Sequence, residues 1–197
     1  MESYINSIFN EITETVNKFI GDSSHQLIEI STHIASCFES GGKLMIFGNG
    51  GSASDAQHIA AEFVNRFQME RPSLPAIALT TDTSVLTSIG NDYNFNEIFE
   101  KQLMALAKPG DIAWGISTSG NSENVLKGLR FCAREEIKTL GFAGRDGGKM
   151  NGLSDLLLIS PSETTARIQE IHIMAAHIIC GLVDELLFGR FNPDIME

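Results

Sequence analysis

The sequence has few cysteines, and their number and spacing exclude two kinds of site. Its 197 residues include three cysteines, none of them in a Cys-x-x-Cys arrangement. This pattern indicates neither a disulfide framework nor a thiolate metal site. We therefore interpret Cys37, Cys132 and Cys180 as core residues of a reduced, cytoplasmic protein.

The sequence also lacks a surplus of basic residues. It contains 14 Lys and Arg against 25 Asp and Glu, for a formal net charge of −11. Nonspecific binding to nucleic acid requires clusters of Lys and Arg, so we expect no nucleic-acid partner. The overall field repels anions, so an anionic substrate must be held by local dipoles and hydroxyl groups.

Long apolar runs, a basic leader, repeats and linkers are lacking too. No apolar run approaches the roughly 20 residues that span a bilayer, and Met1-Glu2-Ser3 does not begin a secretory signal. We expect no membrane association. An apolar share of 43% and a charged share of 20% are those of an ordinary globular domain. We predict a single domain over residues 1–197.

Apolar residues at helical spacing predict two helices before the first strand. The first covers residues 1–20 and the second residues 25–40, with Gly21-Asp22-Ser23-Ser24 as the break between them. We expect residues 1–42 to pack on the sheet and to form an oligomer interface, because the apolar stripe of the first helix is long and wide.

Short apolar runs then alternate with helical segments. The predicted strands are residues 43–47, 76–79, 112–116, 139–143 and 156–159. The predicted helices are residues 52–67, 84–106, 122–136, 148–152 and 164–187. Mostly continuous apolar strands are typical of a parallel sheet covered on both faces. The sequence therefore predicts an α/β fold, a three-layer α/β/α sandwich with a five-stranded parallel sheet.

A glycine-rich turn follows the first predicted strand. Gly48-Asn49-Gly50-Gly51-Ser52 leads from that strand into a helix. Glycines let the backbone approach an oxyanion, and the free amides of the first helical turn point at it. Ser52 and Asp55 fit a capping box, which predicts that the helix starts at about Ser52.

A second polar turn follows the third predicted strand. Ser117-Thr118-Ser119-Gly120-Asn121-Ser122 again opens a helix. Any one serine there is explained as a cap or turn residue. Two such turns at the carboxyl ends of strands favour a shared phosphate site. Neither turn is a dinucleotide fingerprint or a Walker loop, so we exclude NAD and ATP.

Several polar residues on helices are candidates for chemistry. His58 and Glu62 stand four apart and share one helix face. On the last helix, Gln169 is followed by His172 and His177, and periodicity alone does not choose between the two histidines. After the second strand, the segment 80–84 and then Asn91-Asp92 fit either contacts to sugar hydroxyls or helix caps and turns.

These motifs together resemble a known family. The two polar turns, with Asp55, His58 and Glu62, the run Arg167-Ile168-Gln169-Glu170, and His177, resemble the sugar isomerase (SIS) fold and, within it, the bacterial phosphoheptose isomerases. The likeness covers nearly the whole chain. It implies conversion of sedoheptulose 7-phosphate to D-glycero-D-manno-heptose 7-phosphate. Such an aldose–ketose isomerisation moves a proton between adjacent carbons through an enediol.

The resemblance also implies roles for individual residues. Glu62 and His177 would be the catalytic acid–base pair, which leaves His172 as a packing histidine. One zinc ion per subunit would be bound by His58, Glu62, Gln169 and His177. The implied substrate-binding residues are Asn49, Gly50, Gly51, Ser52, Glu62, Asn91, Asp92, Ser117, Thr118, Ser119, Ser122 and Gln169.

The spacing between two of the implied zinc ligands bears on the oligomeric state. Gln169 and His177 are eight residues apart, about 12 Å along a continuous helix. One ion is hard to reach from both in a single copy, unless long side chains lean inward or the helix begins after Gln169. A site shared between subunits removes the difficulty, and the resemblance implies a homotetramer with interfacial sites.

One departure and one alternative accompany the resemblance. Some family members have an Asp where this chain has Ala166, so any help from that carboxylate in proton transfer is missing here. A related non-catalytic SIS tetramer binds the bacterial replication initiator protein. It lacks equivalents of Glu62 and His177. This sequence keeps both, which favours the enzyme.

Overall fold

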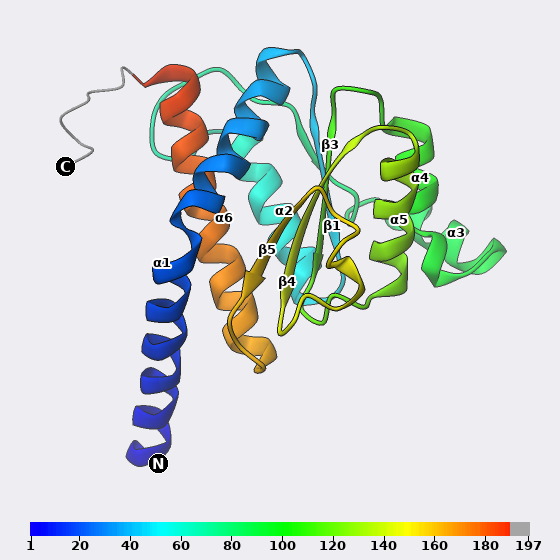
Figure 1. Ribbon diagram of the computed structural model, residues 1–197. Helices are drawn as coiled ribbons and strands as arrows, with labels where there is room; N and C mark the ends of the chain where they lie inside the picture. Colours follow the sequence, from blue (N-terminus) through cyan, green and yellow to red (C-terminus); the bar gives the residue numbers. More distant parts are fainter. Residues whose placement is uncertain (190–197) are drawn as a thin grey trace.

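The computed structural model describes residues 1–189, and the last eight residues of the predicted domain lie outside this range (Figure 1). The strands are β1 (Leu44–Gly48), β2 (Ala76–Ala78), β3 (Ile112–Ser117), β4 (Lys138–Gly144) and β5 (Leu156–Ser160). The α-helices are α1 (Glu2–Glu39), α2 (Gly51–Val64), α3 (Thr83–Asp92), α4 (Glu100–Leu106), α5 (Glu123–Arg134) and α6 (Thr165–Phe188). Two short 3₁₀ helices are η1 (Phe95–Glu97) and η2 (Gly148–Met150).

All five predicted strands are present and form one parallel sheet. The strand order is β2-β1-β3-β4-β5. Strand β1 pairs with β3 from Leu44 opposite Ile112 to Gly48 opposite Ile116. Every residue of β1 and β3 is buried, as expected of continuous apolar strands in the middle of a parallel sheet.

Helices cover both faces of the sheet, which confirms the predicted three-layer sandwich. Helices α1, α2 and α6 lie on one face, and α3, α4 and α5 on the other (Figure 1). Each face has its own core. Trp114 and Phe142 belong to the core under α1, α2 and α6, whereas Phe47 and Phe99 pack with α4 and α5.

The two predicted N-terminal helices are one helix, so the break predicted at residues 21–24 is wrong. Helix α1 runs from Glu2 to Glu39. Its buried stripe continues in phase through that segment, at Phe19, Ser23 and Leu27. A glycine inside a helix costs only about 1 kcal/mol relative to alanine. Packing of the continuous stripe against α6 and β5 outweighs that cost.

The N-terminal part of α1 extends beyond the rest of the molecule (Figure 1). Tyr4, Ile5 and Phe9 there expose between half and three quarters of their surface. Further along, the side-chain amide of Gln26 donates a hydrogen bond to the carbonyl of Leu157 on the edge strand β5, at 2.5 Å. The same helix thus covers the body of the fold at one end and presents apolar side chains at the other.

Helix α6 qualifies the expectation that no apolar run approaches the length of a membrane span. By length and composition alone it is long and apolar enough to cross a membrane, with a mean hydropathy of 1.7 in its most apolar 18 residues. Of that window, 44% is buried inside the fold, where Ile171 and Ala175 contact the sheet-side core. A core helix of an α/β sandwich combines length and apolarity in the same way.

The predicted helix over residues 84–106 is three shorter helices, α3, η1 and α4. The chain leaves α3 after Asp92, and Asn94 adopts an extended conformation. Its side chain accepts a hydrogen bond from the amide of Asn96 at 2.9 Å and so caps η1. An Asn that can bond its own backbone competes with helix continuation. The remaining predicted boundaries lie within about three residues of those observed.

Candidate active site

The glycine-rich turn lies at the carboxyl edge of the sheet, as predicted. A β-carbon at Gly48 would overlap the carbonyl oxygen of Ile116 on the neighbouring strand, so the turn can only follow β1 this closely with glycine there. Gly50 has a positive φ of 55° and is the N-cap of α2. The amides of the first turn of α2 therefore face the space beyond β1.

The predicted capping box is wrong. Helix α2 begins at Gly51, with Gly50 as N-cap and no side-chain cap bond. Ser52 is instead buried inside the first turn. One carboxylate oxygen of Asp55 is buried without a hydrogen-bond partner among the described residues. Burial raises the pKa of this carboxyl, and nearby His58 acts in the opposite direction.

The second polar turn lies beside the first because β1 and β3 are paired. The Ser117 hydroxyl donates to the Ser122 hydroxyl at 3.0 Å, and the Ser119 hydroxyl accepts from the amide of Asn121 at 3.1 Å. Helix α5 begins directly after Ser122. We call residues 48–52 and 117–122 the anion cradle, since both supply hydroxyls and lead into a helix start, which favours an anion without a cation.

A pair of amide side chains joins the two halves of the cradle. Asn49 Nδ2 donates to Asn124 Oδ1 at 2.9 Å, and Asn124 Nδ2 donates to Asn49 Oδ1 at 2.8 Å. Asn124 is almost fully buried in the first turn of α5. Asn124 is not among the predicted site residues; the signal in the sequence was a polar residue directly before the apolar stripe that starts at Val125.

A second group of functional side chains lies between α2 and α6. His58 Nε2 is 3.1 Å from Glu62 Oε1, and His177 Nε2 is 3.4 Å from His58 Nε2. The three ligand atoms lie within 4.8 Å of one another. We call these residues the α2–α6 cluster. It brings together His58, Glu62 and His177 as predicted, across 119 residues of sequence.

The cluster can hold a metal ion by the chemistry of its donors. Two imidazole nitrogens and a carboxylate oxygen converge on one small space. This donor set suits zinc and other divalent first-row metals. Two imidazole nitrogens at 3.4 Å can also share a proton, so the geometry serves acid–base chemistry as well.

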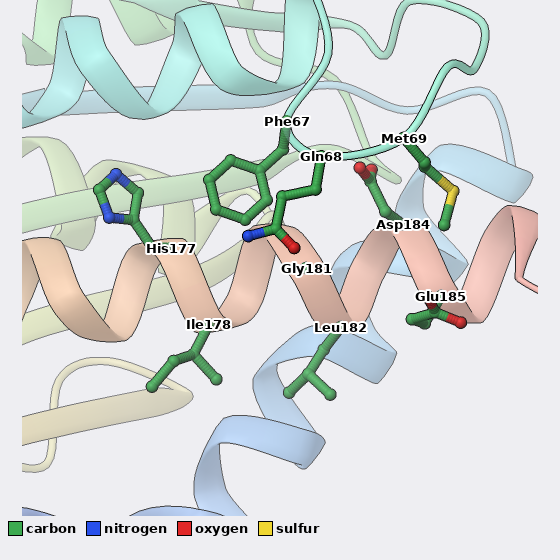
Figure 2. A pocket seen from close by; sticks show the side chains of 9 residues that line it. All are labelled: Phe67, Gln68, Met69, His177, Ile178, Gly181, Leu182, Asp184 and Glu185. Atoms are coloured by element: carbon green, nitrogen blue, oxygen red, sulfur yellow. The ribbon is translucent and has the colours of Figure 1, made fainter. Parts of the chain in front are cut away.

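A groove runs from the cluster along α6. It has a volume of about 400 Å³ and lies between α6 and the loop that carries Phe67 and Gln68 (Figure 2). The Phe67 ring stacks on His177, with ring centres 5.5 Å apart. His177 and Asp184 point toward this loop, whereas Ile178 and Leu182 point the other way (Figure 2).

The structure places Gln169 at the anion cradle. A β-carbon at Gly51 would overlap the carboxamide nitrogen of Gln169. Helix α6 begins at Thr165, before Gln169, and continues without a break past His177. The separation of eight residues from Gln169 to His177 therefore spans about 12 Å. The possibility that the helix begins after Gln169 is excluded.

Asn91 and Asp92 lie at the end of α3, in the layer on the other face of the sheet from α2 and α6 (Figure 1). Both are exposed, and Asn91 Nδ2 donates to Asp92 Oδ1 at 2.9 Å. Asp82, in the segment after β2, caps α3 by accepting from the amide of Val85 at 3.0 Å. The cap interpretation therefore holds for Asp82.

His172 is the packing histidine, as predicted. It is almost fully buried, and its Nε2 donates to the carbonyl of Ala143 at 2.9 Å. Burial lowers the pKa of His172 to about 4, so the ring is neutral near pH 7. Ala166 is exposed in the first turn of α6, next to Arg167, which pairs with Glu170 and with Glu11 of α1.

Comparisons with known proteins agree with this geometry. The SIS domain family matches residues 7–144. The phosphoheptose isomerase of Aquifex aeolicus is 50% identical over 94% of this chain and 97% of its own length. That of Clostridium acetobutylicum is 47% identical over 96% and 98%.

Solved structures give the same result. The phosphoheptose isomerase from Neisseria gonorrhoeae superposes with a TM-score of 0.88 at 40% identity, covering 93% of this chain and 98% of that one. The enzyme from Francisella tularensis gives 0.90 at 37% identity, covering 93% and 97%.

Proposed function

This chain belongs to the SIS domain family and, within it, to the phosphoheptose isomerases, and we propose that it converts sedoheptulose 7-phosphate to D-glycero-D-manno-heptose 7-phosphate. This would be the first step in making nucleotide-activated heptose, in the cytoplasm. The convergence of His58, Glu62 and His177 beside the sheet carries the proposal. The similarity supports the catalytic interpretation over binding of the replication initiator.

The reaction needs two kinds of group, and the chain has both. One must move a proton between adjacent carbons, and another must exchange protons with the neighbouring oxygens. We assign these tasks to the Glu62 carboxylate and the His177 imidazole. The hydroxyls of Ser52, Ser117, Ser119 and Ser122 and the amides at the starts of α2 and α5 would bind the phosphate. Asn91 and Asp92 would contact the sugar.

We further propose that the cluster binds one zinc ion per subunit through His58, Glu62 and His177, with Gln169 of another subunit as a further ligand. A bound cation would place positive charge beside the substrate oxygens. Glu62 would then both bind the metal and accept a proton. Metal coordination lowers the basicity of a carboxylate. A Glu62 carboxylate that serves as the base would therefore need to be free of the ion.

The spacing along the helices supports a shared site in a homotetramer. Ser52 and Glu62 are ten residues apart on α2, about 15 Å, and Gln169 and His177 are similarly separated on α6. The cradle and the cluster of one chain are therefore separated along the axes of both helices. We propose that the cradle of one subunit and the cluster of another complete each site, with the exposed apolar residues of α1 in the subunit contacts.

Turnover of sedoheptulose 7-phosphate tests the activity. We expect turnover that falls on chelation, returns with zinc, and is lost in Glu62→Gln and in His177→Gln. Exposed Glu135→Gln and His25→Gln are matched controls and should retain turnover. Turnover that survives chelation would remove zinc from the proposal. A folded, zinc-loaded protein without turnover would favour the initiator-binding alternative.

Mixing of two inactive variants tests the shared site. One is His177→Gln, with a defective cluster, and the other is Ser117→Ala/Ser122→Ala, with a defective cradle. If sites are shared, mixed oligomers contain some sites with an intact cradle and an intact cluster, and turnover returns. No recovery in verified mixed oligomers, or full activity of diluted monomers, would place the whole site within one chain.

A further inference from the structure

Arg71 is a buried arginine outside the residues assigned to chemistry. It lies in the loop between α2 and β2, and its side chain is 0% exposed. A guanidinium is always charged and is costly to bury unless all its donors are used. The partners of Arg71 therefore show what its burial achieves.

Most of these partners are carbonyl oxygens at the end of α2. Arg71 Nη2 donates to the Glu62 carbonyl at 2.8 Å, and Nη1 donates to the Phe63 carbonyl at 2.7 Å. A longer bond reaches the carbonyl of Asn65, just past the helix end, at 3.2 Å. The last carbonyls of a helix lack intrahelical donors and carry the negative end of its dipole. Arg71 thus caps the very turn that carries Glu62.

Nη1 also donates to the carbonyl of the adjacent Pro72 at 3.1 Å, and a further partner lies on α6. Arg71 Nε donates to Asp184 Oδ1 at 2.8 Å, and the Asp184 side chain is 3% exposed. Asp184 comes seven residues after His177, which places both on one face of α6; both point toward the loop that precedes Arg71 (Figure 2). One guanidinium therefore bridges the helix of Glu62 and the helix of His177.

We propose that Arg71 is a positioning residue that fixes the distance between Glu62 on α2 and His177 on α6. This inference rests on the proposed function, since it assigns Arg71 to the α2–α6 cluster. It includes Phe67, because the short loop that Arg71 anchors at both ends also stacks Phe67 on His177. The planar fork of arginine supplies donors in several directions at once, which lysine cannot do.

The competing explanation is that Arg71 only stabilises the fold. A double replacement separates the two roles. Arg71→Met alone leaves the buried Asp184 carboxylate unpaired, and this destabilises any fold. Arg71→Met/Asp184→Leu removes both charges, and such apolar replacements are often neutral for stability. The double variant still lacks the Arg71 donor to the Glu62 carbonyl, whereas the Phe63 carbonyl keeps its bond from the Leu74 amide at 3.0 Å.

The experiment compares wild type, Arg71→Lys, Arg71→Met and Arg71→Met/Asp184→Leu. It measures Tm, Co²⁺ affinity from the absorption spectrum of bound Co²⁺, and kcat and KM for sedoheptulose 7-phosphate. Arg134→Met, on an exposed arginine of α5, controls for loss of charge. Cys132→Ala, in the core on the other face of the sheet, controls for loss of stability.

We expect the Arg71 variants to lose about 10- to 100-fold in Co²⁺ affinity and in kcat, the usual cost of removing a group that orients a ligand. KM should change little, because Arg71 makes no contact with the cradle among its bonds. The double variant should recover the wild-type Tm without recovering kcat or Co²⁺ affinity. Both controls should keep Co²⁺ affinity and kcat.

Three results would overturn the proposal. The first is recovery of kcat and Co²⁺ affinity together with Tm in the double variant. The second is wild-type behaviour of Arg71→Lys in both measurements, and the third is an equal loss in Cys132→Ala. A wild-type protein that binds Co²⁺ but does not turn over would remove the isomerase function, while the affinities would still test Arg71. A wild type that does neither would remove both proposals.

Discussion

The two ends of helix α2 carry different kinds of functional group. Its N-terminal end, in the anion cradle, offers backbone amides and serine hydroxyls, which keep their protonation state across the physiological pH range. Its C-terminal end carries His58 and Glu62, whose protonation and ligands are part of the proposed chemistry. One helix thus carries a binding end and a reactive end about 15 Å apart.

The two ends also differ in how they are held. The cradle follows from two local strand-to-helix turns that parallel pairing places side by side. The cluster exists only because α6 packs beside α2 and brings His177 to His58. Damage to one end should therefore leave the other intact.

The largest effect is expected from breaking the reactive end. His177→Gln should lower kcat by about 100- to 10,000-fold, the range for loss of a general acid or base. Competitive inhibition by inorganic phosphate should not change, because the cradle is untouched. Steady-state kinetics with phosphate as inhibitor measures both. A parallel loss of phosphate inhibition would contradict the separation.

Breaking the binding end should give the complementary result. Ser117→Ala removes a hydroxyl from the cradle, and a hydrogen bond to a charged group is worth about 1.5–3 kcal/mol. KM and the inhibition constant of phosphate should rise about 10- to 100-fold, with a much smaller change in kcat. Co²⁺ affinity should be unchanged. Exposed Ser36→Ala is the control, and a loss of Co²⁺ affinity would show that the ends are coupled.

Asn124→Ala should loosen the binding end without removing a group that contacts substrate. It leaves the half-buried Asn49 side chain without its partner, at a cost of about 1 kcal/mol in the free energy of unfolding, the net worth of a typical hydrogen bond. KM should rise several-fold, with Co²⁺ affinity unchanged. Urea unfolding and kinetics measure the two effects, with exposed Asn96→Ala as control. An unchanged KM would mean that the amide pair only stabilises the fold.

The smallest expected effect is on the pH dependence of stability, and it involves neither end of α2. His172 has a folded pKa of about 4, lowered by burial, against about 6.5 for an exposed histidine. Its contribution to stability is complete above about pH 6.5 and is lost as pH falls toward 4, because only the unfolded state takes up the proton there. His172→Gln should flatten this fall in urea midpoints between pH 7 and 4.5. An unchanged slope would assign the acid sensitivity elsewhere.

Prediction from sequence succeeded where the determining contacts are local. The strands were predictable because buried parallel strands are continuous apolar runs, and the cradle was predictable because a strand, a glycine turn and a helix start are adjacent in the chain. His58 and Glu62 share a face by spacing alone. The choice of His177 over His172 came from the family resemblance, and the burial of His172 against Ala143 is consistent with it.

Prediction from sequence failed where packing between distant segments determines the structure. The break at residues 21–24 was expected from composition, but the stripe through Ser23 packs well enough to keep α1 continuous. Asn124 and Arg71 look like ordinary surface residues in the sequence. Their roles depend on partners 75 and 113 residues away, and no periodicity or spacing reveals such pairs.

The continuity of α1 has a consequence for how this chain can change length. Because no flexible joint separates its two halves, an insertion or deletion near Gly21 rotates the exposed apolar tip about the helix axis by about 100° per residue. A change of one or two residues turns Tyr4, Ile5 and Phe9 away from any surface they contact. A change of seven residues returns them to nearly the same direction. Length variation at this point of α1 should therefore be tolerated in steps of seven residues.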